Sequence, residues 1–461
     1  MNQKTDIRFQ APDYWYRRGL NILKLVPGAR LASSPGGGLE VEVIDPGQGE
    51  LTVIVRRGVK SWEKTVAASH QSFLRALFLL LSEDNGQPLS PWGILTGVRP
   101  GKLAATLMRT AGPRQAALQL QRDYLVAADK AELVMEAVVN GLPLLTESGL
   151  SIYVSVPFCP SRCHYCSFAS HLLADWKHCL DDYLIVAAKE LQQVLDFCRI
   201  RQVKVNSIYV GGGTPTVLQP AQLEQLLQPA ANPGCEFTVE AGRPDTVNGE
   251  KLAVLAALGV NRVSVNCQFP DDATLAAIGR THSVAEFETA LEAALASAIP
   301  VVNTDLVVGL PGQHARSFCQ ALTGLVDRQV ENITIHSLAV KRGAQIRNQY
   351  LAPEEAADIA RQSYRLLKDA GYLPYYLYRQ KNIAANQENV GFGRPGTFCY
   401  YNIASIAESE PVIGVGAAAV SKLVNVDSIE TLNNPRDPGT YLQRSQDLLT
   451  RKLAWLDSRF C

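Results

Sequence analysis

The sequence predicts an α/β protein whose central part is an incomplete, TIM-like (β/α)6 barrel. Six apolar runs of β type alternate with stretches of helical periodicity. The runs begin near Ile152, Val205, Glu236, Arg262, Val302 and Ile333. Units that alternate a strand with a helix form parallel sheets with right-handed crossovers, and such a sheet can curl into part of a barrel. Polar or glycine residues follow these runs, as expected for the barrel face where reactive groups collect.

Composition and charge limit the classes of function. The chain has 461 residues, enough for two or three domains. Lysine plus arginine and aspartate plus glutamate both number 44, so the formal net charge is zero and nothing suggests a nucleic-acid partner. The start of the chain lacks the apolar core of a signal peptide, and the apolar run 73–81 is too short to span a membrane. Ten cysteines in such a chain indicate thiols or metal ligands, and we expect a cytoplasmic protein.

Three regions are predicted along the chain. Residues 1–148 form an N-terminal α+β domain, residues 149–343 the barrel, and residues 344–461 a C-terminal extension close to the substrate. In the first region, the alternating runs 39–44 and 51–57 flank a Pro/Gly-rich turn and predict a β-hairpin. Helical periodicity predicts helices over 70–81, 102–109, 113–125 and 131–139.

A cysteine motif follows the first strand of the barrel. Cys159, Cys163 and Cys166 have C-x3-C-x2-C spacing directly after the apolar run 152–158. A short loop can place three thiolates on three irons of a [4Fe-4S] cube, which leaves the fourth iron open to a small molecule. Zinc is the alternative, but it usually takes four ligands, and His164 is too close in sequence to complete a tetrahedron. Chance clustering among the ten cysteines is the other alternative.

The residues around this motif resemble those of a known protein family. The segment IYVSVPFCPSRCHYCSF, with an aromatic residue before the last cysteine, resembles the radical S-adenosylmethionine (SAM) superfamily. Within it the chain is similar to the oxygen-independent coproporphyrinogen III oxidase family, and most similar to its coproporphyrinogen dehydrogenase (HemZ) branch. The likeness runs from about Ile152 to near the C-terminus and includes the N-terminal phrase PWGILTGVRPGK. It implies a barrel of the radical SAM type, a [4Fe-4S] cluster held by the three cysteines, and SAM on the open iron.

The resemblance also implies a set of SAM contacts. Backbone around the glycine run approaches the methionyl part, Glu240 binds the ribose, Arg280 a carboxylate and Asp305 the adenosine. The full set is Tyr153, Tyr165, Gly212, Gly213, Thr214, Glu240, Gln268, Arg280, Asp305 and Ala339.

Ordinary structural roles remain open for several of these residues. A glycine run is often only a turn. Glu240 could instead form an ion pair with Arg243 or Arg262. Arg280 could be a surface residue, and Asp305 a structural buried aspartate. The other cysteines, such as Cys198 and Cys267, are expected to be buried thiols.

The C-terminal region holds a candidate substrate site. Tyr378, Arg379 and Lys381 belong to a segment rich in tyrosine that could stack on a flat macrocycle and pair with its carboxylates. The alternative is an aromatic strand with solvated basic ends. The run 412–419 is rich in glycine and alanine and allows tight packing or close approach to a ligand.

The leading functional hypothesis is a radical SAM oxidoreductase of porphyrin and haem biosynthesis. The resemblance implies conversion of coproporphyrinogen III to protoporphyrinogen IX by oxidative decarboxylation of propionates to vinyl groups. It also implies a tetrapyrrole substrate and an electron-donor protein of flavodoxin or ferredoxin type. Two positions depart from the oxidase branch: Phe168 stands where that branch has a fourth cysteine, and Ser155 where it usually has a histidine.

Two alternatives stay open. One is a haem-binding chaperone, another branch of the same family, although Tyr400–Ile403 lacks that branch's histidine and tryptophan. The other is a radical SAM enzyme that acts on a different tetrapyrrole, including haem itself.

Overall fold

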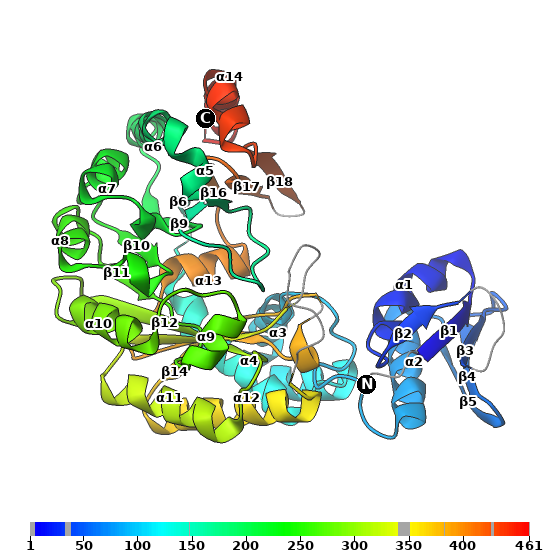
Figure 1. Cartoon of the computed structure of the whole chain (residues 1–461). Helices are drawn as coiled ribbons and strands as arrows, with labels where there is room; N and C mark the ends of the chain where they lie inside the picture. The colour runs from blue at the N-terminus through cyan, green and yellow to red at the C-terminus, as the bar shows by residue number, and fades with distance from the viewer. Residues whose placement is uncertain are drawn as a thin grey trace. The chain divides into compact units, whose positions relative to one another are not determined.

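The computed structural model describes residues 5–32, 38–146, 148–339, 351–381, 383–425 and 428–460 (Figure 1). The chain divides into two compact units. The first is Met1–Val138 with Arg379–Lys381 and Ala385–Gln387. The second is Val139–Tyr378 with Asn382–Ala384 and Glu388–Cys461. The boundary predicted after residue 343, and Cys461, lie outside the described residues.

The N-terminal unit is built on a five-stranded sheet in the order β2-β1-β3-β4-β5. Its strands are β1 (Thr5–Gln10), β2 (Ala29–Leu31), β3 (Leu39–Ile44), β4 (Glu50–Arg57) and β5 (Lys60–Ala67). The predicted hairpin is confirmed, because β3 and β4 pair antiparallel with Val41 opposite Val55. Helices α1 (Asp13–Leu23) and α2 (His70–Asn85) share an apolar core with the sheet, centred on Phe73.

The remaining helices of this unit differ from the prediction in one respect. The two helices expected over 102–109 and 113–125 form one element, α3 (Pro100–Tyr124). It is kinked at Gly112, whose φ of 76° is left-handed, immediately before Pro113. Helix α4 (Ala128–Gly141) matches the fourth predicted helix. None of the helices in the described ranges has the length and hydrophobicity that a bilayer crossing requires.

The second unit contains the predicted barrel sheet. Six neighbouring strands run parallel in the order β13-β12-β11-β10-β9-β6. They are β6 (Leu150–Val156), β9 (Val205–Gly212), β10 (Glu236–Ala241), β11 (Arg262–Val265), β12 (Val301–Val308) and β13 (Asn332–Ser337). Each begins within two residues of its predicted start, which confirms the α/β barrel prediction.

The C-terminal region extends this sheet at both edges to eleven strands. At one edge β15 (Asn389–Gly393) and β14 (Leu373–Tyr378) join β13 antiparallel. At the other edge β16 (Val412–Val415) pairs parallel with β6 and continues into β17 (Val420–Val424) and β18 (Ile429–Asn433). The glycine- and alanine-rich run therefore begins as a strand beside the one that carries the cysteine motif.

The two faces of the sheet differ in chemistry. One face presents aliphatic side chains, such as the fully buried Ile152, Val210 and Val263, to a layer of helices. These outer helices are α6 (Leu180–Ile200), α7 (Pro220–Leu227), α8 (Gly249–Ala257), α10 (Val284–Leu295), α11 (Ala315–Asp327) and α12 (Pro353–Asp369) (Figure 1). Because strand side chains alternate, the intervening residues face the concave side, which we call the inner face. It carries the tyrosines and carboxylates described below.

Two further helices secure this arrangement. Helix α13 (Tyr400–Ala407) lies on the inner face, where Ile403 packs with Tyr375, Tyr376 and the partly buried Tyr209. Helix α14 (Pro438–Phe460) packs on α6 through a fully buried ion pair between Lys452 and Glu190. Both helices come from the C-terminal region, so that region completes the barrel unit.

Candidate active site

The cysteine motif forms a closed loop at the carboxyl end of β6. A two-residue strand, β7 (Phe158–Cys159), pairs parallel with β8 (His171–Leu172) and ties the two ends of the loop together. Cys163 and Cys166 lie within it, where the amide of Cys166 donates to the carbonyl of Cys163 at 3.2 Å. All three thiols are free and partly exposed.

The three thiols lie within electrostatic reach of one another. Burial raises the pKa of Cys159 and of Cys166, and the charge of Cys163 adds to both increases. The hydroxyl of Thr214 opposes this at Cys159 by donating to its Sγ at 3.5 Å. Bound iron would favour the thiolates strongly, because metal-coordinated thiols lose their protons.

The described residues contain no group of three His, Cys, Asp or Glu side chains drawn together around a single metal ion. A cubane cluster does not require such a group, because each thiolate binds a different iron. His164 Nδ1 lies 3.0 Å from the carbonyl oxygen of Ala277 and is engaged there.

Neighbouring loops anchor the cysteine loop on three sides. The buried guanidinium of Arg243 donates to Ser161 Oγ at 2.7 Å. The amide of His164 donates to the carbonyl of Ile278 at 2.9 Å. The guanidinium of Arg280 donates to Tyr165 Oη at 3.2 Å. Side chains from outside the loop therefore set its position relative to the barrel.

The glycine run after β9 brings backbone close to this loop. A Cβ on Gly213 would lie 2.5 Å from the carbonyl oxygen of Phe158, and Gly212 has a left-handed φ of 106°. A Cβ on Gly211 would lie 3.0 Å from the Glu240 carboxylate. No side chain fits at Gly213 without moving the strand that leads to Cys159, so the run forms a cradle of bare backbone.

Glu240 occupies the inner face at the end of β10. Tyr209 donates to its Oε1 at 2.7 Å. Burial raises the pKa of Glu240 to about 7, with the Tyr209 hydrogen bond acting against burial and the Asp305 charge adding to it. The alternative ion pairs of Glu240 with Arg243 or Arg262 do not form, because those guanidiniums bind Asp245 and Glu236.

Asp305 and His336 face Glu240 from β12 and β13. His336 Nε2 lies 3.7 Å from Asp305 Oδ2, and His336 Nδ1 lies 3.5 Å from the hydroxyl of Tyr378. Burial acts to raise the pKa of Asp305, but His336 and Asn303 outweigh it, so the pKa is lowered. Asp305 therefore remains a carboxylate on the inner face.

Arg280 and Gln268 lie beside these groups. Arg280 is buried and donates to the carbonyls of Asn266 and Gly242 at 2.5 and 3.1 Å, while its Nε has no partner among the described residues. Gln268 has a φ of 74°, a conformation that favours glycine, and its amide donates to the carbonyl of Asp305. A non-glycine residue held in this way is typical of a functional site.

The other predicted contacts lie on or next to the same sheet. Tyr153 faces the inner side of β6 with its ring centroid 6.2 Å from that of Tyr209 and 6.2 Å from that of Tyr401. Ala339 follows β13 and forms a bridge with Ile383. Tyr209 and Tyr401 were not predicted as site residues. Tyr209 could have been found, because it lies two residues before Gly211 and so shares its face.

The predicted substrate residues have different surroundings. Tyr378 faces the barrel interior beside His336. Arg379 belongs to the N-terminal unit, where its guanidinium donates to the carbonyls of Leu95 and Asn386 and lies 5.5 Å from the Trp92 ring. Lys381 is exposed. The guanidinium of Arg379 is therefore engaged by backbone carbonyls of its own unit.

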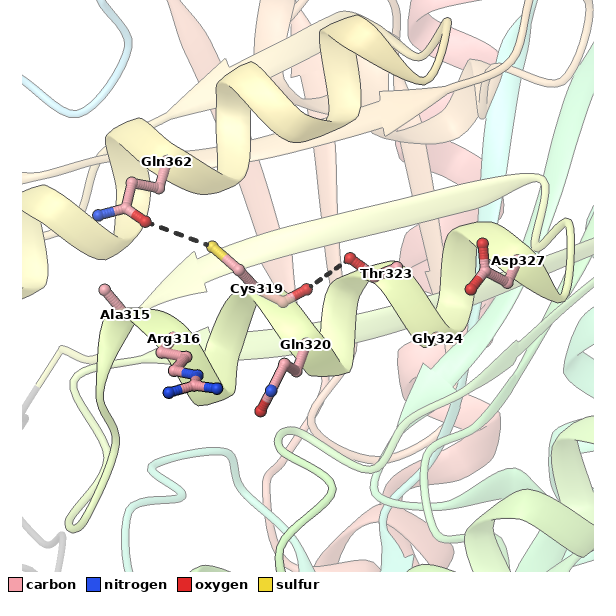
Figure 2. A pocket seen from close by; sticks show the side chains of 8 residues that line it. All are labelled: Ala315, Arg316, Cys319, Gln320, Thr323, Gly324, Asp327 and Gln362. Carbon is pink, nitrogen blue, oxygen red and sulfur yellow. Dashed lines mark hydrogen bonds between the residues drawn. The ribbon is translucent and has the colours of Figure 1, made fainter.

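A shallow groove on the outside of the barrel unit is a separate feature. Figure 2 shows Cys319 of α11 directed toward Gln362 of α12, with 3.8 Å between Sγ and Oε1. The other lining residues are Ala315, Arg316, Gln320, Thr323, Gly324 and Asp327. None of the predicted site residues lines this groove.

Comparison with known proteins agrees with this geometry. The profile of the radical SAM superfamily matches residues 153–323. The oxygen-independent coproporphyrinogen-III oxidase-like protein HemZ of Bacillus subtilis is 34% identical over 417 residues, which cover 86% of this chain and 83% of HemZ. The chain belongs to the radical SAM superfamily. Within it, the chain belongs to the family of oxygen-independent coproporphyrinogen-III oxidase-like proteins.

Other proteins match a smaller share of the chain. The haem chaperone HemW of Escherichia coli is 29% identical over 315 residues, which cover 65% of this chain and 78% of HemW. The structure of coproporphyrinogen III oxidase (HemN) from Escherichia coli superposes with a TM-score of 0.53 at 23% identity, covering 69% of this chain and 72% of HemN. The HemN match supports the fold.

The radical SAM family uses a [4Fe-4S] cluster and SAM, which confirms the cofactor prediction. The residues present fit both groups. Three free thiols share one loop, bare backbone lies beside them, and Glu240 and the Nε of Arg280 offer a buried acceptor and a buried donor. A sulfonium amino acid with a ribose diol is complementary to this set.

Proposed function

We propose that this radical SAM protein decarboxylates the propionate side chains of coproporphyrinogen III oxidatively and forms protoporphyrinogen IX. The observation that carries the proposal is the similarity to HemZ along 86% of the chain. The inner face supports it, because tyrosine rings and Tyr378 border the space where a flat macrocycle would bind.

Each site residue has a proposed role. Cys159, Cys163 and Cys166 hold the cluster, and the loop anchors keep it at the barrel mouth. The backbone of Gly212, Gly213 and Thr214 lies along the methionyl part of SAM, and Arg280 receives its carboxylate. Glu240 accepts from the ribose, while Asp305, Gln268, Tyr153, Tyr165 and Ala339 surround the adenosine.

When bound, the cluster and SAM would supply the radical chemistry that removes one hydrogen atom from the substrate. The hydrogen comes from the β-carbon of a propionate, and the substrate radical then passes one electron to a one-electron acceptor and loses CO2, which leaves a vinyl group. The protein orients that carbon and excludes water. We further propose a flavodoxin- or ferredoxin-type electron donor and a cytoplasmic location.

Anaerobic reconstitution tests this proposal. The protein should turn brown with iron and sulfide, cleave SAM in the presence of dithionite, and release CO2 from coproporphyrinogen III. SAM cleavage that depends on another tetrapyrrole, without CO2 release from coproporphyrinogen III, would redirect the substrate assignment.

The second candidate is a haem chaperone, which the 29% identity to HemW favours. Stoichiometric haem binding without turnover of any tetrapyrrole would support it over the oxidase.

A further inference from the structure

We propose that Tyr209 is a positioning residue that orients the Glu240 carboxylate toward the ribose of SAM. This inference rests on the proposed role of Glu240 and adds a residue that no comparison assigns. Tyr209 lies on β9 and Glu240 on the neighbouring β10, both on the inner face. The phenol hydroxyl donates to Glu240 Oε1 at 2.7 Å.

The carboxylate keeps most of its acceptor capacity for a ligand. Two carboxylate oxygens offer about four acceptor positions. In the part of the chain that the structure describes, Tyr209 is the one donor to Glu240. The bare backbone of Gly211 borders the carboxylate, since a Cβ there would lie 3.0 Å from Oε2. A ribose diol can therefore donate to the side of the carboxylate that Tyr209 leaves open.

The phenol is suited to act as the donor. Burial, together with the Glu240 charge, raises the pKa of Tyr209 well above its usual value, so it keeps its proton at neutral pH. The charged and titratable groups facing Glu240 are Tyr153, Tyr401, Asp305 and His336. Among these groups and Tyr209, only the phenol of Tyr209 donates to Glu240.

A second carboxylate on the same strand supports the Tyr209 ring. Glu236, also on β10, accepts from the first amides of α13, with Tyr400 N at 2.7 Å and Tyr401 N at 2.9 Å. This fixes the start of α13 and places the Tyr401 ring 4.4 Å from the Tyr209 ring at an angle of 23°. The stack restricts the Tyr209 rotamer, so its hydroxyl is already directed at Glu240 before SAM binds.

The test measures SAM binding to the anaerobically reconstituted protein by equilibrium dialysis, without turnover. Tyr209→Phe keeps the ring and removes the donor, and we expect about ten-fold weaker SAM binding, equal to about 1.4 kcal/mol. A SAM analogue without the ribose hydroxyls should bind both proteins equally. Tyr372→Phe is the matched control, because it removes another buried phenol, bonded to the carbonyl of Val330, and should not change affinity.

The pH profile separates positioning from a structural role. SAM binding should weaken as the pH falls and Glu240 takes a proton. The midpoint of this pH dependence should move to higher pH in Tyr209→Phe, because the carboxylate loses its hydrogen-bond donor. Replacing Tyr209 with 3-fluorotyrosine should move this midpoint to lower pH, because the fluorinated phenol is more acidic and is a stronger hydrogen-bond donor. This second replacement retains the native shape if the phenylalanine variant folds poorly.

The outcomes distinguish this inference from the proposed function. If Glu240→Gln weakens SAM binding and neither change at 209 alters affinity or midpoint, Tyr209 has no positioning role and the ribose contact stands. If Glu240→Gln binds SAM as tightly as the wild type, the ribose contact itself is wrong.

Discussion

Arg280 and Tyr165 form a hydrogen bond of 3.2 Å that joins the loop between α9 (Asp272–Ala277) and α10 to the cysteine loop. The same guanidinium donates to the carbonyls of Asn266 and Gly242, at the ends of two barrel strands. One side chain thus connects the proposed cluster loop to the mouth of the barrel.

Replacing Arg280 should impair SAM binding. Arg280→Lys keeps the charge but loses the forked geometry that reaches Tyr165 and two carbonyls together. We expect at least ten-fold weaker SAM binding, measured by equilibrium dialysis. Arg328→Lys is the control, because Arg328 pairs with Glu288 on an exposed surface. Equal loss in both variants would contradict a specific role for Arg280.

Removing one motif cysteine should abolish the cluster. Cys163→Ala leaves two thiolates, too few to hold three irons, so reconstituted protein should lack cluster absorption and most of its iron. Iron and sulfide per chain give the measurement. Cys319→Ala, on the outer groove of Figure 2, should retain full iron content. Retention of the cluster in Cys163→Ala would refute the ligand assignment.

Adding one carbon at Gly213 should disturb the site. The new Cβ of Gly213→Ala would lie 2.5 Å from the Phe158 carbonyl, so the end of the cysteine strand must move. We expect loss of most SAM binding, with a cluster that is lost more rapidly to a chelator. Gly249→Ala meets no atom within 4 Å and serves as the control. A normal chelation rate and SAM affinity in Gly213→Ala would show that the contact is not limiting.

Glu240 should make stability depend on pH. Its pKa is about 7 in the folded protein against an ordinary value of 4.5, so the folded state binds the proton more tightly between these values. The contribution of Glu240 to the free energy of unfolding is therefore full below pH 4.5 and disappears as the pH rises through 7. Without SAM, the wild-type protein should lose up to about 3 kcal/mol of unfolding free energy between these pH values relative to Glu240→Gln. The loss is smaller where solvent reaches the carboxylate. Thermal unfolding at several pH values measures the difference, and a constant difference would contradict the shift.

The buried Lys452–Glu190 pair should contribute strongly to stability. Glu190 also accepts from Tyr441 Oη at 2.6 Å and Gly416 N at 2.8 Å, so Lys452→Met leaves a buried charge without its cation. We expect a loss of about 3–5 kcal/mol, measured by chemical denaturation. Arg201→Met breaks the exposed ion pair with Asp457 of α14, the helix that also carries Lys452, and should cost at most about 1 kcal/mol of unfolding free energy. Similar losses would mean that burial of the pair is unimportant.

Much of the barrel could be predicted because its strands are apolar and evenly separated by helical segments. The cysteine motif and the glycine run could also be recognised, since both combine rare residues at strand ends. Strand β16 could not be assigned, because its pairing with β6 depends on residues far apart in sequence. The same holds for Tyr401, which reaches the inner face only because Glu236 fixes the start of α13. The role of Arg379 was also hidden, because its partner Leu95 is distant in sequence.

The pairing of β6 with β16 has a consequence for biogenesis. The strand leading to the cysteine loop gains one neighbour early in synthesis, but the other only when Val412 has emerged from the ribosome. Until then that strand presents an open edge, the kind of surface on which nascent chains associate. We therefore expect iron–sulfur assembly to act on finished polypeptide, and chains cut short after β15 to aggregate rather than mature.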